Sequence, residues 1–494
     1  EKEKIEKIKY VDYEDYAQRK YTKINDKLNV SNVIANDKYT IVMDQYGNGY
    51  STYKGIQVNR FKQTEDVDEG IMFYIKNIRN KKLWTNTVKK FEERPEKYSI
   101  IFAPESDEFS RTDENIETTT KVIVDTDEPV EIRKLKLKNT GNNEEMLEVT
   151  SYIEPIISKR FQDYSHKAFN NLFLRYEYIE EINTILIERK AKSDNEQDVF
   201  MAVNLYCENN SVSNLEFEID KEKFTGRDNF EFPKCVKNSL PLSTSIGYTT
   251  DPIIAMKRTV TVKPKEVAEL NLIISLGNNR EDTLNNIVKF MNNENINRTI
   301  ELLRAKSEAE NRYLGIKGKE IETYQKILTH LMFAEKNENK IVPKNIKPRV
   351  SDLWKFGISG DNPILLLKVK DITDIDIVKD VLKAYEFFRV KNIKIDLVII
   401  NEEKESYENI VREAVSSTVL NKNLAYLLNV SGGIFILINL EKNDKAILEA
   451  KSNLVINANY SSLEQQIDDL ETRIIEQIKE VSEDSAKGKI VEDY

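Results

Sequence analysis

The chain has 494 residues, a hydrophobic fraction of 40% and a net charge of −10, from 84 acidic and 74 basic residues. This length exceeds the size at which one hydrophobic core stops growing, so we expect two or three globular domains. The acidic balance argues against a nucleic-acid partner, because phosphate binding requires clustered lysine and arginine.

Cysteine and histidine are too rare for a disulfide framework or a multi-histidine metal centre. The chain has two cysteines, Cys207 and Cys235, and two histidines, His166 and His330. We therefore expect no metal and no cofactor, and the cysteine usage is typical of a reducing, cytoplasmic interior. No apolar run reaches the length of a membrane span, so we expect no membrane contact from this segment. The charged opening at Glu1 does not resemble a signal peptide, and we expect the segment to belong to a longer chain.

Residues 1–30 form a charged lead-in segment, which we expect to pack on the edge of the first domain. Alternation over Tyr39–Met43 then predicts a strand with one buried face. The stretch Tyr46–Ser51 follows as a turn, because Gly47 and Gly49 permit positive φ angles. Its flanking tyrosines suit either the core of a β-hairpin or the C–H face of a sugar ring.

Residues 31–280 alternate apolar and polar side chains in many short segments. This pattern predicts a large antiparallel β-sandwich. Gly141–Asn143 and Lys263–Glu266 each separate two strands as hairpin turns do. Along Val130–Leu137 the apolar phase slips, which indicates a β-bulge.

The pattern becomes helical at residues 281–345, which we expect to be a helical linker. Residues 346–440 alternate apolar runs with helix-like segments and predict a small α/β domain with a partly parallel sheet. Residues 441–494 are expected to be a C-terminal helical tail, whose long helix starts with a capping box at Ser461 and Glu464. The fold class is therefore multidomain and mainly β, with a sandwich, a helical linker and a small α/β unit.

Familiar catalytic motifs are absent from the chain. It has no phosphate-binding glycine loop followed by lysine, no His-Glu-x-x-His and no Gly-x-Ser-x-Gly. The carboxylate pairs Glu144–Glu145 and Glu180–Glu181 match acid/base chemistry on a glycosidic bond, but equally match solvated strand ends. Trp84 and Trp354 are candidate stacking surfaces, although core positions are commoner for tryptophan.

Two further features could contact a ligand. His166 lies in a loop-like run between aromatic residues, where its imidazole could bind a sugar hydroxyl or hold the loop. Arg227 and Asp228 place a guanidinium beside a carboxylate, a pair that can grip hydroxyls or phosphate or form an exposed ion pair of little consequence.

Several segments in a fixed order resemble the large β-sandwich region of the cyclic β-1,2-glucan synthases, relatives of the cellobiose and cellodextrin phosphorylases. The matching stretches are Ser31–Ser51, Glu131–Gly141, Leu147–Tyr152, His166–Phe169, Thr225–Asp228, Ser245–Pro252 and Leu353–Asp361. The resemblance implies that the sandwich precedes a helical linker and that glycosyl chemistry belongs to a separate (α/α) barrel. No catalytic residue is therefore assigned to this chain.

The resemblance also implies a set of contact residues and partners. Tyr50, His166, Arg227 and Asp228 are expected near a glucan-facing or interdomain surface. The expected partners are a β-glucan oligosaccharide or polysaccharide and the catalytic modules of the same polypeptide. The function implied is carbohydrate contact and domain orientation within an enzyme of glycosyl transfer or phosphorolysis.

Two alternatives remain open at this point. The chain could be a noncatalytic scaffold or oligomerisation module that binds no sugar and docks through the apolar stripe from Leu463 to Ile478. It could also be a complete glycoside phosphorylase or hydrolase that uses carboxylates within the sandwich.

Overall fold

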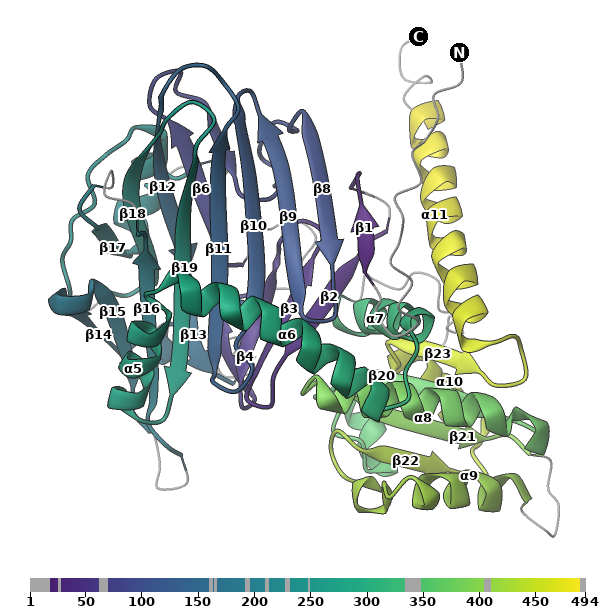
Figure 1. Ribbon diagram of the computed structural model, residues 1–494. Coiled ribbons are helices and arrows are strands. Elements are labelled where there is room, and N and C mark those ends of the chain that lie inside the picture. The colour runs from purple at the N-terminus through teal and green to yellow at the C-terminus, as the bar shows by residue number, and fades with distance from the viewer. Residues whose placement is uncertain are drawn as a thin grey trace.

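The computed structural model describes most of the chain and shows three antiparallel sheets, a run of helices and a small parallel sheet (Figure 1). The described residues are 18–24, 28–61, 70–159, 163, 167–191, 196–208, 213–226, 232–247, 249–333, 348–403 and 410–488.

The largest sheet has nine antiparallel strands in the order β1-β8-β9-β10-β11-β19-β16-β15-β14. These strands are β1 (Arg19–Tyr21), β8 (Lys97–Phe102), β9 (Ser106–Asp113), β10 (Ile116–Val124), β11 (Val130–Asn139), β19 (Val267–Gly277), β16 (Val199–Tyr206), β15 (Thr184–Arg189) and β14 (Leu174–Ile179).

Two five-stranded antiparallel sheets complete the sandwich, with orders β17-β18-β12-β6-β7 and β13-β5-β4-β3-β2. The first contains β17 (Glu216–Asp220), β18 (Pro252–Val262), β12 (Glu145–Ile153), β6 (Met72–Asn77) and β7 (Leu83–Thr85). The second contains β13 (Pro155–Ser158), β5 (Ile56–Asn59), β4 (Gly49–Tyr53), β3 (Tyr39–Asp44) and β2 (Ser31–Ala35). One apolar core, with Ile41, Phe73 and Phe109 fully buried, joins all three sheets. The predicted sandwich is thus confirmed.

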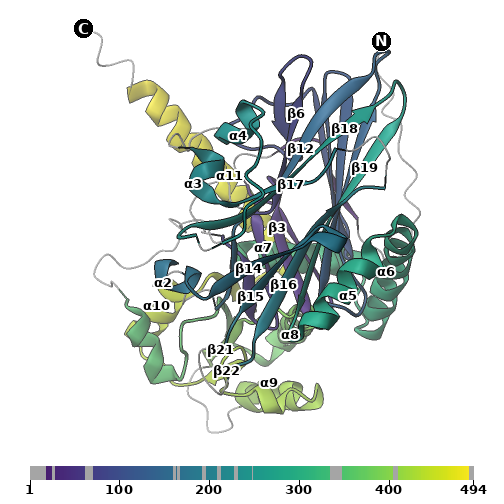
Figure 2. The ribbon, with the colours of Figure 1, turned by 90° about the vertical axis from the view of Figure 1, so that its left-hand side faces the viewer.

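Helices α5 (Arg280–Phe290) and α6 (Asn293–Tyr313) lie on the outer side of the nine-stranded sheet (Figures 1 and 2). Ile287 and Phe290 of α5 pack there against Ile132 of β11 and Ile273 of β19. Figure 2 shows α2 (Lys167–Asn171), α3 (Lys221–Thr225) and α4 (Lys234–Lys237) on the opposite side of the sandwich. The sandwich therefore has one helix-covered side and one side that carries short helices.

The bulge predicted along Val130–Leu137 is wrong, because β11 pairs with β10 and β19 in unbroken register. The phase slip has another cause. Val130 and Ile132 face the helices, while Leu135 and Leu137 face the interior of the sandwich. The apolar phase changes because both faces of this strand are buried over its first half.

Both predicted hairpins are also wrong. Residues 141–143 connect β11 of the nine-stranded sheet to β12 of a five-stranded sheet, and residues 263–266 connect β18 back to β19. These loops cross between sheets and do not join paired strands. The predicted turn is confirmed in its first half, where Gly47 has φ 70°. Its second half, Gly49–Ser51, already pairs with β3 as the start of β4, and a Cβ at Gly49 would lie 1.9 Å from the carbonyl oxygen of Val42.

Strand β3 is buried on both faces, so the prediction of a single buried face is wrong. Ile41 faces the sandwich core, whereas Val42 and Val33 of β2 belong to a second core. That second core contains the apolar stripe of α7 (Gly318–Met332), including Tyr324 and Leu328, within the range predicted to be a helical linker. Helix α7 therefore covers the outer face of β2 and β3.

The small sheet has four strands, all parallel, in the order β22-β21-β20-β23. Its strands are β20 (Ile364–Val369), β21 (Asp396–Asn401), β22 (Ile434–Leu437) and β23 (Leu454–Asn457), and its helices are α8 (Ile375–Val390), α9 (Ile410–Asn421) and α10 (Lys442–Lys451). The strand β23 lies within the range that we expected to be a helical tail. The sheet is nearly all apolar, as expected for parallel strands covered on both faces.

The tail helix α11 (Leu463–Gly488) is present, but Ser462 accepts the backbone N–H of Gln465 at 3.3 Å and takes the place predicted for Ser461. Leu463 and Ile467 are buried in the second core, and Leu470 packs against it. The first half of the stripe offered as a docking face is thus an internal contact. No helix in the described part of the chain has an apolar stretch long enough to cross a membrane.

Candidate functional site

A polar cluster around Arg60 lies where several distant segments of the sandwich meet. Arg60 follows β5 and donates two hydrogen bonds to Asp163, from Nε at 3.1 Å and from Nη2 at 2.8 Å. Its Nη1 also bonds Glu154 at 3.0 Å, between β12 and β13. Glu154 receives two further hydrogen bonds, from Lys221 at 2.5 Å and from the Tyr152 hydroxyl at 2.7 Å. The bidentate contact of Arg60 with Asp163 and the three donors that share Glu154 are typical of strong charge-assisted hydrogen bonds.

Electrostatics hold the cluster in its charged form. Burial alone would raise the pKa of Glu154, but Lys221, the Tyr152 hydroxyl and Arg60 lower that pKa to about 2. Burial acts against the charge of Arg60, and its two carboxylate partners raise its pKa above the usual range. Glu154 is therefore an anion at neutral pH and has no proton to donate as a general acid.

A bulge borders this cluster in β13, where the register shifts between Pro155 and Ser158. Ile157 has φ 42°, which is strained for a β-branched residue. Arg189 holds it in place by donating to the Ile157 carbonyl at 2.8 Å and to Asn170 of α2 at 2.9 Å. Bulges of this kind commonly re-aim side chains near sites, and this one fixes α2 beside the cluster.

Of the four predicted site residues, Tyr50 alone lies within the described residues. Its ring stacks on Phe61 at 5.6 Å, and its hydroxyl lies 3.5 Å from the sulfur of Met332 at the end of α7. Tyr50 is thus at the boundary between the sandwich and the helical linker. Its contact with glucan stays a prediction.

The other three predicted residues, His166, Arg227 and Asp228, lie outside the described residues. Their described neighbours nevertheless converge. Lys167 pairs with Asp251 at 3.0 Å, Asn171 donates to the Thr250 carbonyl at 2.9 Å, and Thr249 donates to Asp220 at 2.9 Å. The segments that flank residues 166 and 227 therefore meet at the same side of the sandwich as Arg60.

The remaining predicted residues have structural roles or no shown role. Trp84 is buried in the core and donates to the Thr118 hydroxyl at 3.0 Å, whereas Trp354 is 65% exposed. Glu145 accepts from Asn77 at 2.9 Å. Among the residues that the structure describes, no group of three histidine, cysteine, aspartate or glutamate side chains could hold a metal ion.

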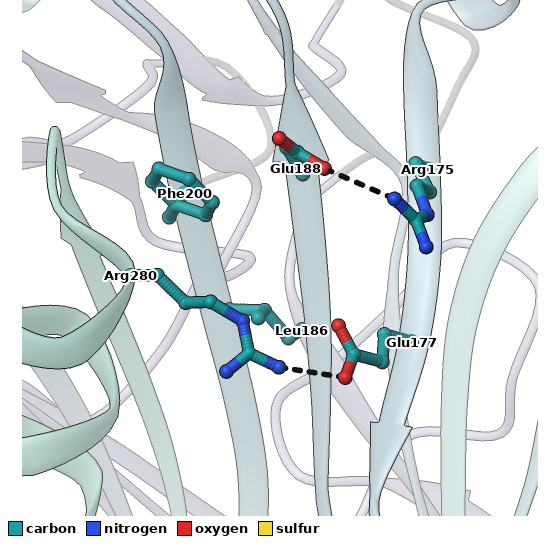
Figure 3. Close-up of a pocket in the computed structure, with 6 residues that line it drawn as sticks. All are labelled: Arg175, Glu177, Leu186, Glu188, Phe200 and Arg280. Carbon is teal, nitrogen blue, oxygen red and sulfur yellow. Dashed lines mark hydrogen bonds and ion pairs between the residues drawn. The ribbon is translucent and has the colours of Figure 1, made fainter.

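A hollow of about 240 Å³ lies on the other side, at the free edge of the nine-stranded sheet (Figure 3). Arg175 and Glu177 reach it from β14, Glu188 from β15 and Arg280 from the start of α5. Arg280 pairs with Glu177 at 2.6 Å and Arg175 with Glu188 at 3.8 Å, beside the ring of Phe200. The hollow combines an aromatic wall with charged groups that water reaches.

The sequence analysis did not predict the residues of the Arg60 cluster or of the hollow. The residues of the first cluster come from three distant parts of the chain, at Arg60, at Glu154 and Asp163, and at Lys221, and no local spacing links the three. Arg175 and Glu177 are two residues apart on a strand, so their shared face could have been found from strand periodicity. Their ion-pair partners, Glu188 and Arg280, come from other elements, so strand periodicity could not have predicted them.

The match to known families decides what this sandwich is. The family model of the glycosyl hydrolase 94 supersandwich domain matches residues 14–293, more than half of the chain. The chain belongs to this family. The supersandwich assignment covers the nine-stranded sheet, both five-stranded sheets and α5, and it confirms the resemblance found in the sequence.

One curated relative of this chain is a glucan synthase. The chain is 26% identical over 397 residues to the cyclic beta-(1,2)-glucan synthase NdvB of Rhizobium meliloti (strain 1021), covering 79% of this chain and 14% of that protein. The chain thus spans about one seventh of that relative.

Two solved structures show a partial likeness. One is a bacterial glucoamylase complexed with acarbose, with TM-score 0.33 and 10% identity over 63% of this chain and 44% of that chain. The other is a putative kojibiose phosphorylase from human microbiome, with TM-score 0.31 and 8% identity over 64% and 38% of the two chains.

Proposed function

We propose that this chain is the domain-orienting and carbohydrate-contacting region of a multidomain enzyme that performs glycosyl transfer or phosphorolysis on β-linked glucan. The observation that carries the proposal is the apolar core that a supersandwich domain shares, through α7, with the α/β unit. Such a shared core holds two units in one orientation, in contrast to the polar interfaces of domains that move.

Hydrogen bonds to backbone reinforce this junction. Gln325 of α7 accepts the N–H of Val33 at 3.1 Å and donates to its carbonyl at 3.3 Å, so α7 pairs the free edge of β2. From the α/β unit, Asn392 donates to the Asn36 carbonyl at 2.6 Å and Lys391 to the Pro104 carbonyl at 3.1 Å. The junction therefore contacts both the five-stranded and the nine-stranded sides of the sandwich.

The proposed carbohydrate-contacting surface is the side that carries α2. Phe169 is 56% exposed and Leu172 64% exposed, beside the ion pair of Lys167 and Asp251. Apolar and aromatic groups next to charged hydrogen-bonding groups match a sugar, whose C–H faces are apolar and whose hydroxyls donate and accept. His166, Arg227 and Asp228 are proposed to belong to this surface.

The bond-making chemistry is proposed to belong to other modules of the same polypeptide. The carboxylate best placed in the described part of this surface, Glu154, is engaged by three partners and stays ionised. It therefore does not supply the protonated acid that glycoside cleavage needs. The chain is expected to show no turnover alone.

A calorimetric titration with β-1,2-linked and β-1,4-linked gluco-oligosaccharides tests the proposal. We expect saturable binding to the β-1,2-linked series, weakened about tenfold by the double change Phe169→Ala and Leu172→Ala. The control is Leu302→Ala on α6, which is similarly exposed on the opposite side. The absence of any saturable signal would favour the scaffold alternative, and turnover by the chain alone would favour the complete-enzyme alternative.

A further inference from the structure

As the structure describes them, the three antiparallel sheets end in six edge strands, and five of these are protected against pairing with another chain. Strands β1 and β7 have only three residues each. Strands β13 and β17 carry register shifts, and β13 also starts at Pro155. Gln325 of α7 pairs with the outer edge of β2. Short strands, bulges, prolines and covering helices are the features by which native proteins prevent edge-to-edge association.

Strand β14 is the edge strand of these sheets that has none of these features in the described part of the chain. It has six residues, Leu174–Ile179, and pairs with β15 in unbroken register. Among the described residues, no backbone–backbone hydrogen bond links β14 to any element other than β15. Figure 2 shows β14 at the end of the sheet, beside β15 and β16. The outer edge of β14 therefore presents N–H and C=O groups that can pair with a further strand.

The side chains of β14 are complementary to those of a second, antiparallel copy of the same strand. In a pair centred on Tyr176, Arg175 of each copy lies opposite Glu177 of the other. Opposite residues of an antiparallel pair point to the same face, with Cβ atoms about 4.5–5.5 Å apart, so two ion pairs can form. Moving the centre to Arg175 or to Glu177 places two like charges opposite each other. The charges therefore favour one register.

Both charged side chains are accessible for such a contact. Arg175 is 65% exposed, and its guanidinium lies 3.8 Å from Glu188, a distance too long for a hydrogen bond. Arg280 bonds one oxygen of Glu177 at 2.6 Å, and the Glu177 side chain is 44% exposed. Both residues border the hollow of Figure 3, which leaves space for the side chains of a partner strand. The guanidinium of Arg175 can thus turn to the Glu177 of another copy without giving up its contact with Glu188 as a hydrogen bond.

We propose that two copies of this chain associate through their β14 strands, which form an antiparallel pair centred on Tyr176 and join the two nine-stranded sheets into one. This surface is separate from the stripe of α11, and the proposal does not depend on the proposed function. A pair of six-residue strands is smaller than a standard protein interface, so we expect weak association, with a dissociation constant on the order of 100 µM.

Two opposite charge reversals test this pair by sedimentation equilibrium. The average mass of the wild type is expected to rise from 57.5 kDa toward twice that value between about 10 µM and about 1 mM. Arg175→Glu places glutamates opposite each other in both pairs, and Glu177→Arg places arginines there. Each variant alone is therefore expected to associate at least about tenfold more weakly. An equimolar mixture of the two variants has opposite charges in both pairs again and is expected to recover most of the wild-type association.

The controls Arg298→Glu and Glu301→Arg make the same changes of charge at exposed positions of α6, which lies away from β14. They are expected to associate as the wild type does. Hydrogen exchange gives a second readout, because at the higher concentration exchange is expected to slow in β14 and not in the edge strand β7. A wild type that stays monomeric up to about 1 mM would overturn the proposal. A mixture that associates no better than its separate variants, or controls that weaken association equally, would also overturn it.

Discussion

The cluster around Arg60 and the hollow of Figure 3 both pair arginine with carboxylates, but at very different degrees of burial. In the cluster around Arg60, the side chains of Arg60, Asp163 and Glu154 are 4%, 11% and 15% exposed. In the hollow of Figure 3, Arg175 is 65% exposed and Arg280 46%. Buried charges must keep their partners, whereas exposed ones can exchange them for water or ligand. The first cluster is therefore expected to fix structure, and the second to be dispensable for folding.

The largest effect is expected from Arg60→Met. This change leaves the carboxylates of Asp163 and Glu154 without their shared cation, so we expect a loss of about 3–5 kcal/mol in the free energy of unfolding. Chemical denaturation at neutral pH measures it. Arg175→Met, at the exposed pair, is the matched control and is expected to change stability by less than about 1 kcal/mol. Equal losses of stability in the two variants would contradict the expected difference between the buried and the exposed cluster.

Lowering the pH is expected to reveal how much the buried cluster contributes to the free energy of unfolding. The pKa of Glu154 is about 2 in the folded chain against 4.5 ordinarily, so its contribution is complete above pH 4.5 and is lost as the pH falls toward 2. Glu154→Gln removes this dependence. The stability difference between wild type and variant is expected to shrink by up to about 3 kcal/mol over that range. A difference that stays constant with pH would show that Glu154 is not held as an anion.

Much of the fold could be predicted from the sequence because its signals are local. The alternation over residues 31–280, the stripe of α7 and the apolar runs of the small sheet each indicate one element. The hairpins at 141–143 and 263–266 were wrong because a loop's residues do not tell whether the next strand pairs with the last one or crosses to another sheet. The bulge in β11 was wrong because burial of both faces mimics a change of phase.

The site was harder to predict than the fold. Tyr50 was singled out from the turn beside it and its contact with glucan stays a prediction, whereas its contact with Met332 depends on a helix that lies 282 residues later in the chain. Arg60 and Glu154 gave no signal at all, because a buried ion cluster is built from residues that share no spacing. The stretches that carry the family resemblance include the neighbouring Leu147–Tyr152 but neither Arg60 nor Glu154.

A smaller effect is expected at the junction from Gln325→Leu. The change leaves the N–H and carbonyl of Val33 unpaired under α7, with an expected loss of about 1–3 kcal/mol. Thermal unfolding and exchange of the β2 amides measure it. Lys319→Leu, on the exposed face of the same helix, is expected to be neutral. An unchanged β2 exchange rate would mean that α7 does not protect this edge.

The smallest effect is expected from Arg280→Ala in the hollow of Figure 3. The pair with Glu177 is half exposed, so its loss is expected to cost less than about 1 kcal/mol and to fade in high salt. Denaturation at low and high ionic strength measures this. A larger loss of stability that does not depend on salt would show that this ion pair stabilises the fold as the buried cluster does.

The central claim is that the sandwich and the α/β unit form one rigid body. Spin labels at Lys97 of β8 and Arg412 of α9, both exposed, measure the distance between the units when Cys207 and Cys235 are replaced by serine. We predict a single narrow distance distribution that does not change when glucan is added. A broad or multiple distribution without glucan would contradict the claim.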